Sequence, residues 1–156
     1  MDAIDRIVPG FASALGQAPV TLATQRKLLA TLEQTPLSAR SRAQIALAIA
    51  QRLNCEYCVW VHSCLAEAAG LSGEDIFFAR AGTARDPREA AIVKMSCQVV
   101  SDGVFRNRLA PEAARALGEP EAAAVVAEVA LAIVHCYVLQ SIAPAARDAV
   151  GTRRPV

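Results

Sequence analysis

Aromatic side chains are scarce in this chain of 156 residues, at 4%, and neither sign of charge dominates, with 16 basic and 15 acidic residues. A chain with so few aromatic side chains has few rings on which nucleic-acid bases could stack. A net charge of +1 provides no broad attraction to phosphate. The composition therefore predicts no nucleic-acid partner. It also excludes an intrinsically disordered chain, because 54% of the residues are apolar and can build a core.

The chain also lacks the usual membrane and export signals. Its first residues, MDAIDRIVPGF, carry acids where a signal peptide needs bases, and no apolar stretch follows them. No run reaches 18 uninterrupted apolar residues, so no membrane partner is expected. We therefore expect a cytoplasmic protein. Thiols normally stay reduced there, so a close cysteine pair indicates redox or metal chemistry.

Alanine is abundant, with 33 residues, and it is the best helix former. No strand-like alternation of useful length is present. We therefore predict an all-α fold, a compact bundle of about six to seven helices. The length fits one domain, residues 1–156, with its core at about 36–143. Residues 1–19 are expected to form an irregular lead-in, and 151–156 a frayed tail.

Local signals predict where the helices begin and end. Ser38 fits an N-cap, and Asp86-Pro87 fits an N-cap followed by the first helical position. Gly70 and Gly82 fit the position just after a helix, and Asn54 either ends one helix or caps the next. The helices are expected at about 21–35, 39–53, 55–69, 72–82, 87–100, 111–118 and 121–142.

The last predicted helix, 121–142, is apolar almost all the way round. Glu121, Glu128 and His135 are seven residues apart and share one narrow polar stripe. A single small domain can hardly cover so apolar a helix. The pattern therefore predicts a homo-oligomer packed through 121–142, and the alternative is a central core helix in a monomer.

The segment LNCEYCVWVH carries the strongest chemical signal. A Cys-x-x-Cys pair, Cys55 and Cys58, stands where a helix is expected to begin. Backbone N–H groups and the helix dipole stabilise a thiolate there, and two cysteines at this spacing can close a disulfide. His62 lies one turn beyond Cys58 and can exchange a proton with it. The segment therefore indicates a redox site.

Three other interpretations of these residues are weaker. A zinc site would need Cys64, which lies about 200° from His62 around a helix, so the four ligands would not converge. A c-type haem needs a histidine directly after Cys58, where Val59 stands. Simple burial is the expectation for the remaining cysteines. We expect no metal and no cofactor. The cysteines assigned to burial are Cys64, Cys97 and Cys136.

These residues resemble the alkylhydroperoxidase D-like / carboxymuconolactone decarboxylase superfamily, in its CxxCxxxH subgroup. The resemblance covers about 36–143. It rests on IALAIA at 45–50, NCEYC at 54–58, His62, the GLS turn at 70–72 and the helix that starts near Asp86. It implies an all-α bundle that assembles into dimers, trimers or hexamers.

The resemblance also implies a thiol peroxidase acting in antioxidant defence. In that interpretation Cys58 is the peroxidatic thiolate that attacks an organic hydroperoxide. Cys55 resolves the sulfenic acid as a disulfide, and His62 belongs to the proton relay. An external dithiol or a disulfide-reductase protein then supplies electrons. Local physics alone leaves the attacking cysteine open, because the helix start favours Cys55 and the nearby His62 favours Cys58.

The chain departs from the superfamily pattern at two positions. The relay glutamate expected twelve residues before the first cysteine is Ala43, followed by Gln44. The histidine expected between the cysteines is Tyr57. The nearest carboxylate, Glu56, is either a substitute base or a solvated surface residue. Further relay candidates on the last helix are Glu128 and His135.

Two other functions therefore stay open beside the peroxidase. One is a lactone-acting decarboxylase, as in the carboxymuconolactone branch, whose chemistry needs no redox cysteine pair. The other is a redox-sensing oligomeric protein with little turnover. The presence of Cys55 and Cys58 favours the thiol hydroperoxidase or disulfide reductase.

Overall fold

The computed structural model describes residues 6–7, 23, 27–28, 30–102 and 116–150, and within these ranges it contains helices and no strand. The predicted all-α class is confirmed. Five helices make up the described bundle: α4 (Ala39–Arg52), α5 (Glu56–Ala68), α6 (Gly73–Arg80), α7 (Pro87–Asp102) and α9 (Glu119–Val150).

Some sequence predictions fall outside this part of the chain. The lead-in 1–19 and the tail 151–156 lie almost wholly outside the described residues, as does most of the predicted helix 111–118. The predicted helix 21–35 is described only in part. Its residues 30–32 are helical, and the chain turns at 33–34, before Pro36.

Short polar side chains begin three of the helices, at Ser38 and Asp86 as predicted and also at Ser72. The Ser38 hydroxyl accepts a hydrogen bond from a first-turn backbone amide of α4. Ser72 does the same for α6, and the Asp75 carboxylate accepts from the Ser72 backbone N–H, so the two residues form a capping box. The Asp86 carboxylate accepts hydrogen bonds from two backbone N–H groups in the first turn of α7, with N–O distances of 2.9 Å each. These local bonds explain why the helices begin within a residue of their predicted positions.

The junction between α4 and α5 is a sharp turn at Asn54. This residue has a φ of +50°, and asparagine tolerates the left-handed conformation better than most residues. Of its two predicted roles, Asn54 therefore takes the one that ends α4. The N-cap of α5 is Cys55.

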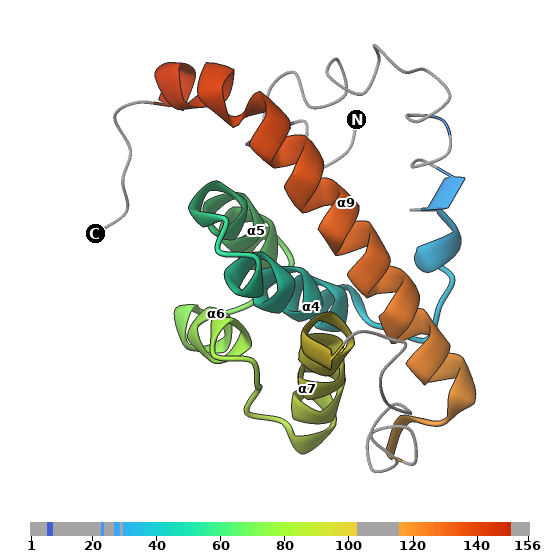
Figure 1. Ribbon diagram of the computed structural model, residues 1–156. Coiled ribbons are helices and arrows are strands. Elements are labelled where there is room, and N and C mark those ends of the chain that lie inside the picture. Colours follow the sequence, from blue (N-terminus) through green and yellow to red (C-terminus); the bar gives the residue numbers. More distant parts are fainter. Residues whose placement is uncertain (1–5, 8–22, 24–26, 29, 103–115, 151–156) are drawn as a thin grey trace.

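α4 lies at the centre of the bundle and packs against α5, α6, α7 and α9 (Figure 1). Every residue from Ile45 to Ala50 is buried, and the side chains of Ile45, Leu47 and Ile49 are 0% exposed. A helix that is apolar on all faces has to be enclosed by its neighbours. The IALAIA run is therefore the core segment around which the other helices are arranged.

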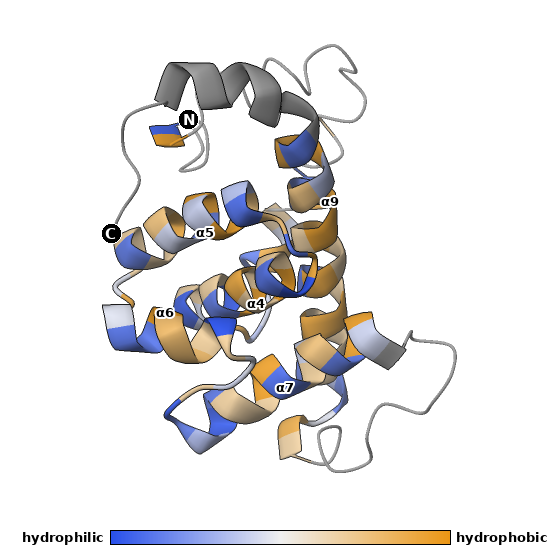
Figure 2. Ribbon diagram, turned by 60° about the vertical axis from the view of Figure 1, so that its left-hand side comes forward, coloured by the Kyte–Doolittle hydropathy of each residue, from blue (hydrophilic) through white to orange (hydrophobic). Residues whose placement is uncertain are grey.

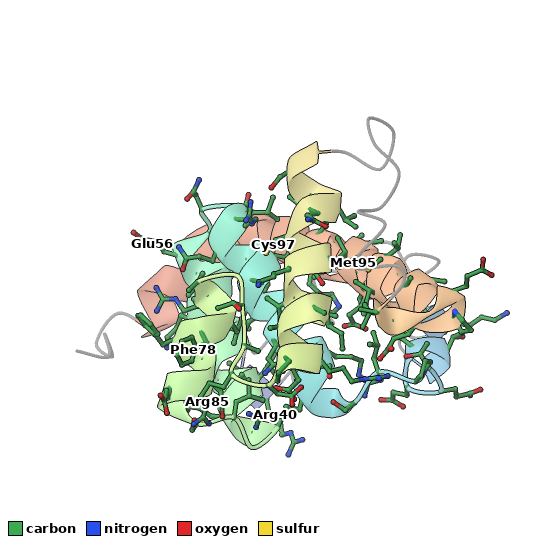
Figure 3. All side chains as sticks on the ribbon, turned by 90° about the horizontal axis from the view of Figure 1, so that it is seen from below. Arg40, Glu56, Phe78, Arg85, Met95 and Cys97 are labelled. Carbon is green, nitrogen blue, oxygen red and sulfur yellow. A yellow bond between two sulfur atoms is a disulfide. The ribbon has the colours of Figure 1, made fainter. Side chains whose placement is uncertain are left out.

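An ion-pair network holds the α6 and α7 starts against α4. Arg40 lies 2.8 Å from the buried Asp75 and 3.1 Å from Glu89, and Arg85 lies 2.8 Å from Asp75. Figure 3 shows Arg40 and Arg85 at the same end of the molecule. The hydrogen bond from Arg40, with those from Ser72 and Arg85, holds the pKa of Asp75 well below its usual range. The buried carboxylate is thereby compensated.

α9 crosses the bundle diagonally and is eight residues longer than the predicted helix 121–142 at its C-terminal end (Figure 1). It continues through Pro144. A proline inside a helix removes one backbone hydrogen bond and usually ends or kinks the helix, so the sequence pattern did not indicate this extension.

The polar stripe predicted on α9 faces the bundle. Glu121 and Glu128 are both buried, and Glu121 pairs with Arg88 at 2.8 Å. Apolar residues dominate the helix (Figure 2). The segment Glu119–Gln140 is long and apolar enough to cross a membrane by length and composition, but 56% of its most apolar stretch is buried inside the protein. That burial is typical of a core helix.

Candidate active site

The close cysteine pair is a disulfide at the start of α5. Cys55 and Cys58 are bonded, with their Cα atoms 5.2 Å apart, a usual separation for a disulfide. Cys55 is the N-cap, and its Sγ accepts a hydrogen bond from the backbone N–H of Cys58 at 3.3 Å. The sulfur thus takes the place that a hydroxyl takes at other helix starts. The site therefore lies at the helix N-terminus, as the sequence predicted.

The two sulfur-bearing residues differ in their surroundings. Cys58 has no exposed surface, while Cys55 keeps 6%. Cys58 Sγ lies 3.6 Å from the backbone oxygen of Cys136 on α9. In the reduced state, a Cys58 thiol can donate to that carbonyl. α9 therefore covers the Cys58 side of the disulfide, which we call its inner side. The Cys55 side is the outer side, nearer to solvent.

His62 is buried one turn beyond Cys58, with 3% exposure. Its ring stacks on that of His135 from α9, with the ring centres 6.4 Å apart and the planes at 20°. Burial, with a smaller contribution from His135, lowers the pKa of His62 to about 3. Within the described part of the chain, its Nε2 has no hydrogen-bond partner. His62 is therefore neutral at pH 7 while the pair is oxidised.

A neutral imidazole in this position can accept a proton. Residues four apart on a helix are neighbours, so His62 can reach Cys58 on the same face of α5. A nearby thiolate favours the charged imidazole and raises its pKa, and burial in a poorly polar site strengthens that attraction. The arrangement can therefore move a proton from the Cys58 thiol onto His62 when the pair is reduced.

Of the two relay candidates on α9, the fold brings His135 to His62 within one chain. Glu128 lies two turns earlier on the same helix and is buried. Burial raises the pKa of Glu128 to about 7, opposed by the charge of Arg42 on α4. No described residue makes a hydrogen bond to its Oε2. Glu128 is thus a buried carboxyl near neutrality, and its charge partner is on α4 rather than in the cysteine site.

The positions where the chain departs from the superfamily pattern have different surroundings. Gln44 is buried and donates to Glu89 on α7 at 2.8 Å, so it faces the ion-pair network. Tyr57 is buried in the same apolar cluster as the disulfide, and its ring stacks on Trp60 at 5.8 Å. Among the residues the structure describes, none bonds to its hydroxyl, and burial raises the pKa of Tyr57.

A cavity of about 240 Å³ opens beside Cys55. Arg80 and Gln51 meet at its wall, where Arg80 Nε donates to Gln51 Oε1 at 2.9 Å. No local sequence pattern singles out either residue, because they come from the ends of two separate helices, α6 and α4. Glu56, the candidate substitute base, is exposed and lies on the same wall. The lining residues are Gln51, Asn54, Cys55, Glu56, Val59 and Arg80.

The other cysteines take no part in the pair. Cys97 and Cys136 are free and buried, as predicted, while Cys64 is free and only half-buried. In the ranges that the structure covers, no three histidine, cysteine, aspartate or glutamate side chains come together as metal ligands.

The sequence model of the carboxymuconolactone decarboxylase family matches residues 19–95. The match takes in α4, α5 and α6 with the cysteine pair, and it ends within α7. No curated protein matches the chain significantly.

Proposed function

Because the chain belongs to the carboxymuconolactone decarboxylase family, we propose that its cysteine pair makes it a thiol-dependent hydroperoxidase. The observation that carries the proposal is the disulfide between Cys55 and Cys58 at the start of α5, with the buried His62 one helical turn beyond Cys58. Disulfide chemistry needs two cysteines within bonding reach, and a decarboxylation does not.

In the proposed reaction, the Cys58 thiolate attacks one oxygen of an organic hydroperoxide. A sulfur–oxygen bond forms, the oxygen–oxygen bond breaks, and the alkoxide leaves as an alcohol after taking a proton. Cys58 is then a sulfenic acid. The Cys55 thiol attacks its sulfur, the disulfide forms, and water leaves. One hydroperoxide and two thiols thus become one alcohol, one water and one disulfide.

His62 handles the proton in this scheme. It accepts the proton of the Cys58 thiol and returns it to the leaving alkoxide, which a neutral buried imidazole next to a developing thiolate is suited to do. Glu56 is exposed beside Cys55. We assign it the exchange of protons with solvent on the outer side of the pair.

An external dithiol or a disulfide-reductase protein then returns the pair to two thiols, in the cytoplasm. We also propose that the protein is a homo-oligomer packed through α9. The exposed residues of this helix between Ala123 and Tyr137 are apolar, and two of them, Val134 and Tyr137, are 43% and 66% exposed. A second copy of the same face would cover them.

The test is a free-thiol count on fully reduced protein before and after one equivalent of cumene hydroperoxide, read out under denaturing conditions. We expect two of the five thiols to be lost within seconds to minutes, to map to Cys55 and Cys58, and to return with a dithiol. The matched control is Cys64→Ser, which should fall from four thiols to two.

Other outcomes would contradict the proposal in distinct ways. If every thiol survives, the pair is not peroxidatic, and the lactone-acting decarboxylase becomes the leading function. If the disulfide forms but excess dithiol does not carry the reaction beyond about one equivalent of alcohol per protein, the protein is a redox sensor with little turnover.

A further inference from the structure

The two sulfurs of the disulfide are not equally accessible. Cys55 lines the cavity of about 240 Å³, and Cys58 is not among the residues that line it. Cys58 is also fully buried against α9, with its Sγ 3.6 Å from the Cys136 carbonyl oxygen. A thiol that arrives from solvent therefore meets the Cys55 side of the disulfide first.

The cavity wall carries both signs of charge close to Cys55. Arg80 supplies a guanidinium from the end of α6, and Glu56 supplies a carboxylate from the first turn of α5. The amides of Gln51 and Asn54 complete a mostly polar lining. Figure 3 shows Glu56 at the edge of the molecule, as expected for a residue that meets an incoming molecule. The α5 N-terminus adds a partial positive charge on the Cys55 side.

This lining fits a small molecule with one carboxylate and one ammonium group. The carboxylate pairs with Arg80 and the α5 N-terminus, and the ammonium pairs with Glu56. The cavity is smaller than the range of about 300–1,000 Å³ that is usual for drug-sized ligands. It therefore suits an amino acid or a short peptide.

We propose that this cavity binds the reductant, a low-molecular-weight amino-acid or short-peptide thiol that attacks the Cys55 sulfur. The inference rests on the proposed redox function of the pair. It replaces the external dithiol or disulfide-reductase protein, as the immediate electron donor, with a small zwitterionic thiol.

The exchange balances in two steps. The thiolate of the first small thiol attacks Cys55 Sγ, a mixed disulfide forms at Cys55, and Cys58 leaves as a thiolate that takes a proton. A second small thiol attacks the sulfur of the bound one. The small disulfide leaves, and Cys55 becomes a thiol. Two small thiols are oxidised to one disulfide, and the protein disulfide is reduced to two thiols.

The first experiment measures how fast four thiols of different charge reduce the oxidised protein. They are L-cysteine, 3-mercaptopropionate, cysteamine and 2-mercaptoethanol. Reactions are stopped with acid, alkylated under denaturing conditions and counted by mass spectrometry. Each rate constant for a variant is divided by the wild-type value for the same thiol, so that intrinsic thiol reactivity cancels.

We expect Arg80→Gln to slow L-cysteine and 3-mercaptopropionate by about twofold to fivefold, the effect of losing one exposed charge pair. Cysteamine and 2-mercaptoethanol should not slow. Glu56→Gln should instead slow L-cysteine and cysteamine. The control Lys94→Gln removes the same unit charge from α7, which does not line the cavity, and should change none of the four.

The second experiment locates the attacked sulfur. Reduced Cys58→Ser and Cys55→Ser proteins are incubated with L-cystine, and the mixed disulfide is followed by mass spectrometry. We expect rapid formation at Cys55 in Cys58→Ser and much slower formation at the buried Cys58 in Cys55→Ser. Equal rates, or a faster reaction at Cys58, would overturn the assignment.

The thiol panel can also overturn the proposal. If Arg80→Gln and Glu56→Gln change the reduction rate constants of all four thiols by the same factor, the charges of the cavity do not select the thiol and the proposal fails. If thioredoxin, in addition, reduces the wild type rapidly, the donor is a protein. No hydroperoxide is used in either experiment. A failure here is therefore distinct from a failure of the peroxidase proposal, which the thiol count with cumene hydroperoxide measures.

Discussion

The imidazole rings of His62 and His135 lie 6.4 Å apart and within 20° of parallel, joining α5 to α9. They are the two histidines of the chain. Because His62 is buried and has a second imidazole beside it, the charged form of His62 is disfavoured twice, first by desolvation and then by His135. The pair therefore keeps a neutral proton acceptor next to the cysteine helix start.

This burial makes stability depend on pH. The pKa of His62 is about 3 in the folded protein against an ordinary value of 6.5, so the unfolded chain binds more protons between these values. The stability that neutral His62 contributes is therefore present above pH 6.5 and is lost as pH falls below that value. From pH 7 to pH 5 the loss due to His62 is about 2 kcal/mol. Urea unfolding of His62→Gln should show a smaller loss over this range than the wild type by that amount. An equal pH dependence would contradict the prediction.

Glu128 acts in the opposite direction. Burial raises its pKa from 4.5 to about 7, so the folded protein holds a proton that the unfolded chain releases. Stability from the neutral carboxyl is present below pH 4.5 and is lost as pH rises through 7. Between pH 5 and pH 8 the wild type should lose about 2–3 kcal/mol that Glu128→Gln retains. Denaturant unfolding at both values measures the difference. Parallel curves for the two proteins would show that Glu128 is solvated.

Substitutions of Cys58 and Cys55 should separate the two chemical steps, formation of the sulfenic acid and formation of the disulfide. Cys58→Ser removes the proposed nucleophile and should abolish hydroperoxide consumption, while Cys55→Ser should consume one equivalent and stop at the Cys58 sulfenic acid. Labelling with dimedone and mass spectrometry identifies that acid. Cys64→Ser should keep wild-type turnover. If the label appears on Cys55 in Cys58→Ser instead, the two roles are exchanged.

Two glycines offer a matched pair of stability tests. Gly73 begins α6 with open space around a Cβ, so Gly73→Ala should stabilise by about 0.5–1 kcal/mol. Gly82 has a φ of +80°, and a Cβ there would lie 3.3 Å from Cys97 Sγ. Gly82→Ala should therefore destabilise by about 1–2 kcal/mol. Thermal unfolding of both variants decides the signs, and two changes of the same sign would contradict the backbone assignment.

The outward face of α9 gives a test of assembly. Tyr137 is 66% exposed on this helix, and Tyr137→Glu places a charge where a second copy is proposed to pack. We expect the variant to sediment as a smaller species than the wild type at the same concentration. Gln98→Glu, at an exposed position of α7, is the charge-matched control. A monomeric wild type would remove the oligomer proposal.

Much of the helical layout was predictable because helix ends are local. Ser38, Ser72 and Asp86 each bond to amides within three residues, so the capping needs no distant partner. The C-terminal end of α9 was predicted wrongly, because the helix continues through Pro144, a residue that usually ends or kinks a helix. The orientation of Gln44 was not predictable either, since its partner Glu89 is 45 residues away.

The sequence by itself determined that the chain is all-helical and that a Cys-x-x-Cys pair stands at a helix start with a histidine one turn on. Those features follow from residue propensity, capping and helical spacing, which act over a few residues. The tertiary structure alone decided that His135 stacks on His62, that α9 buries Cys58, and that Arg80 and Gln51 form a cavity wall beside Cys55. Those contacts depend on how separate helices cross and pack, and no local pattern in the chain records that geometry.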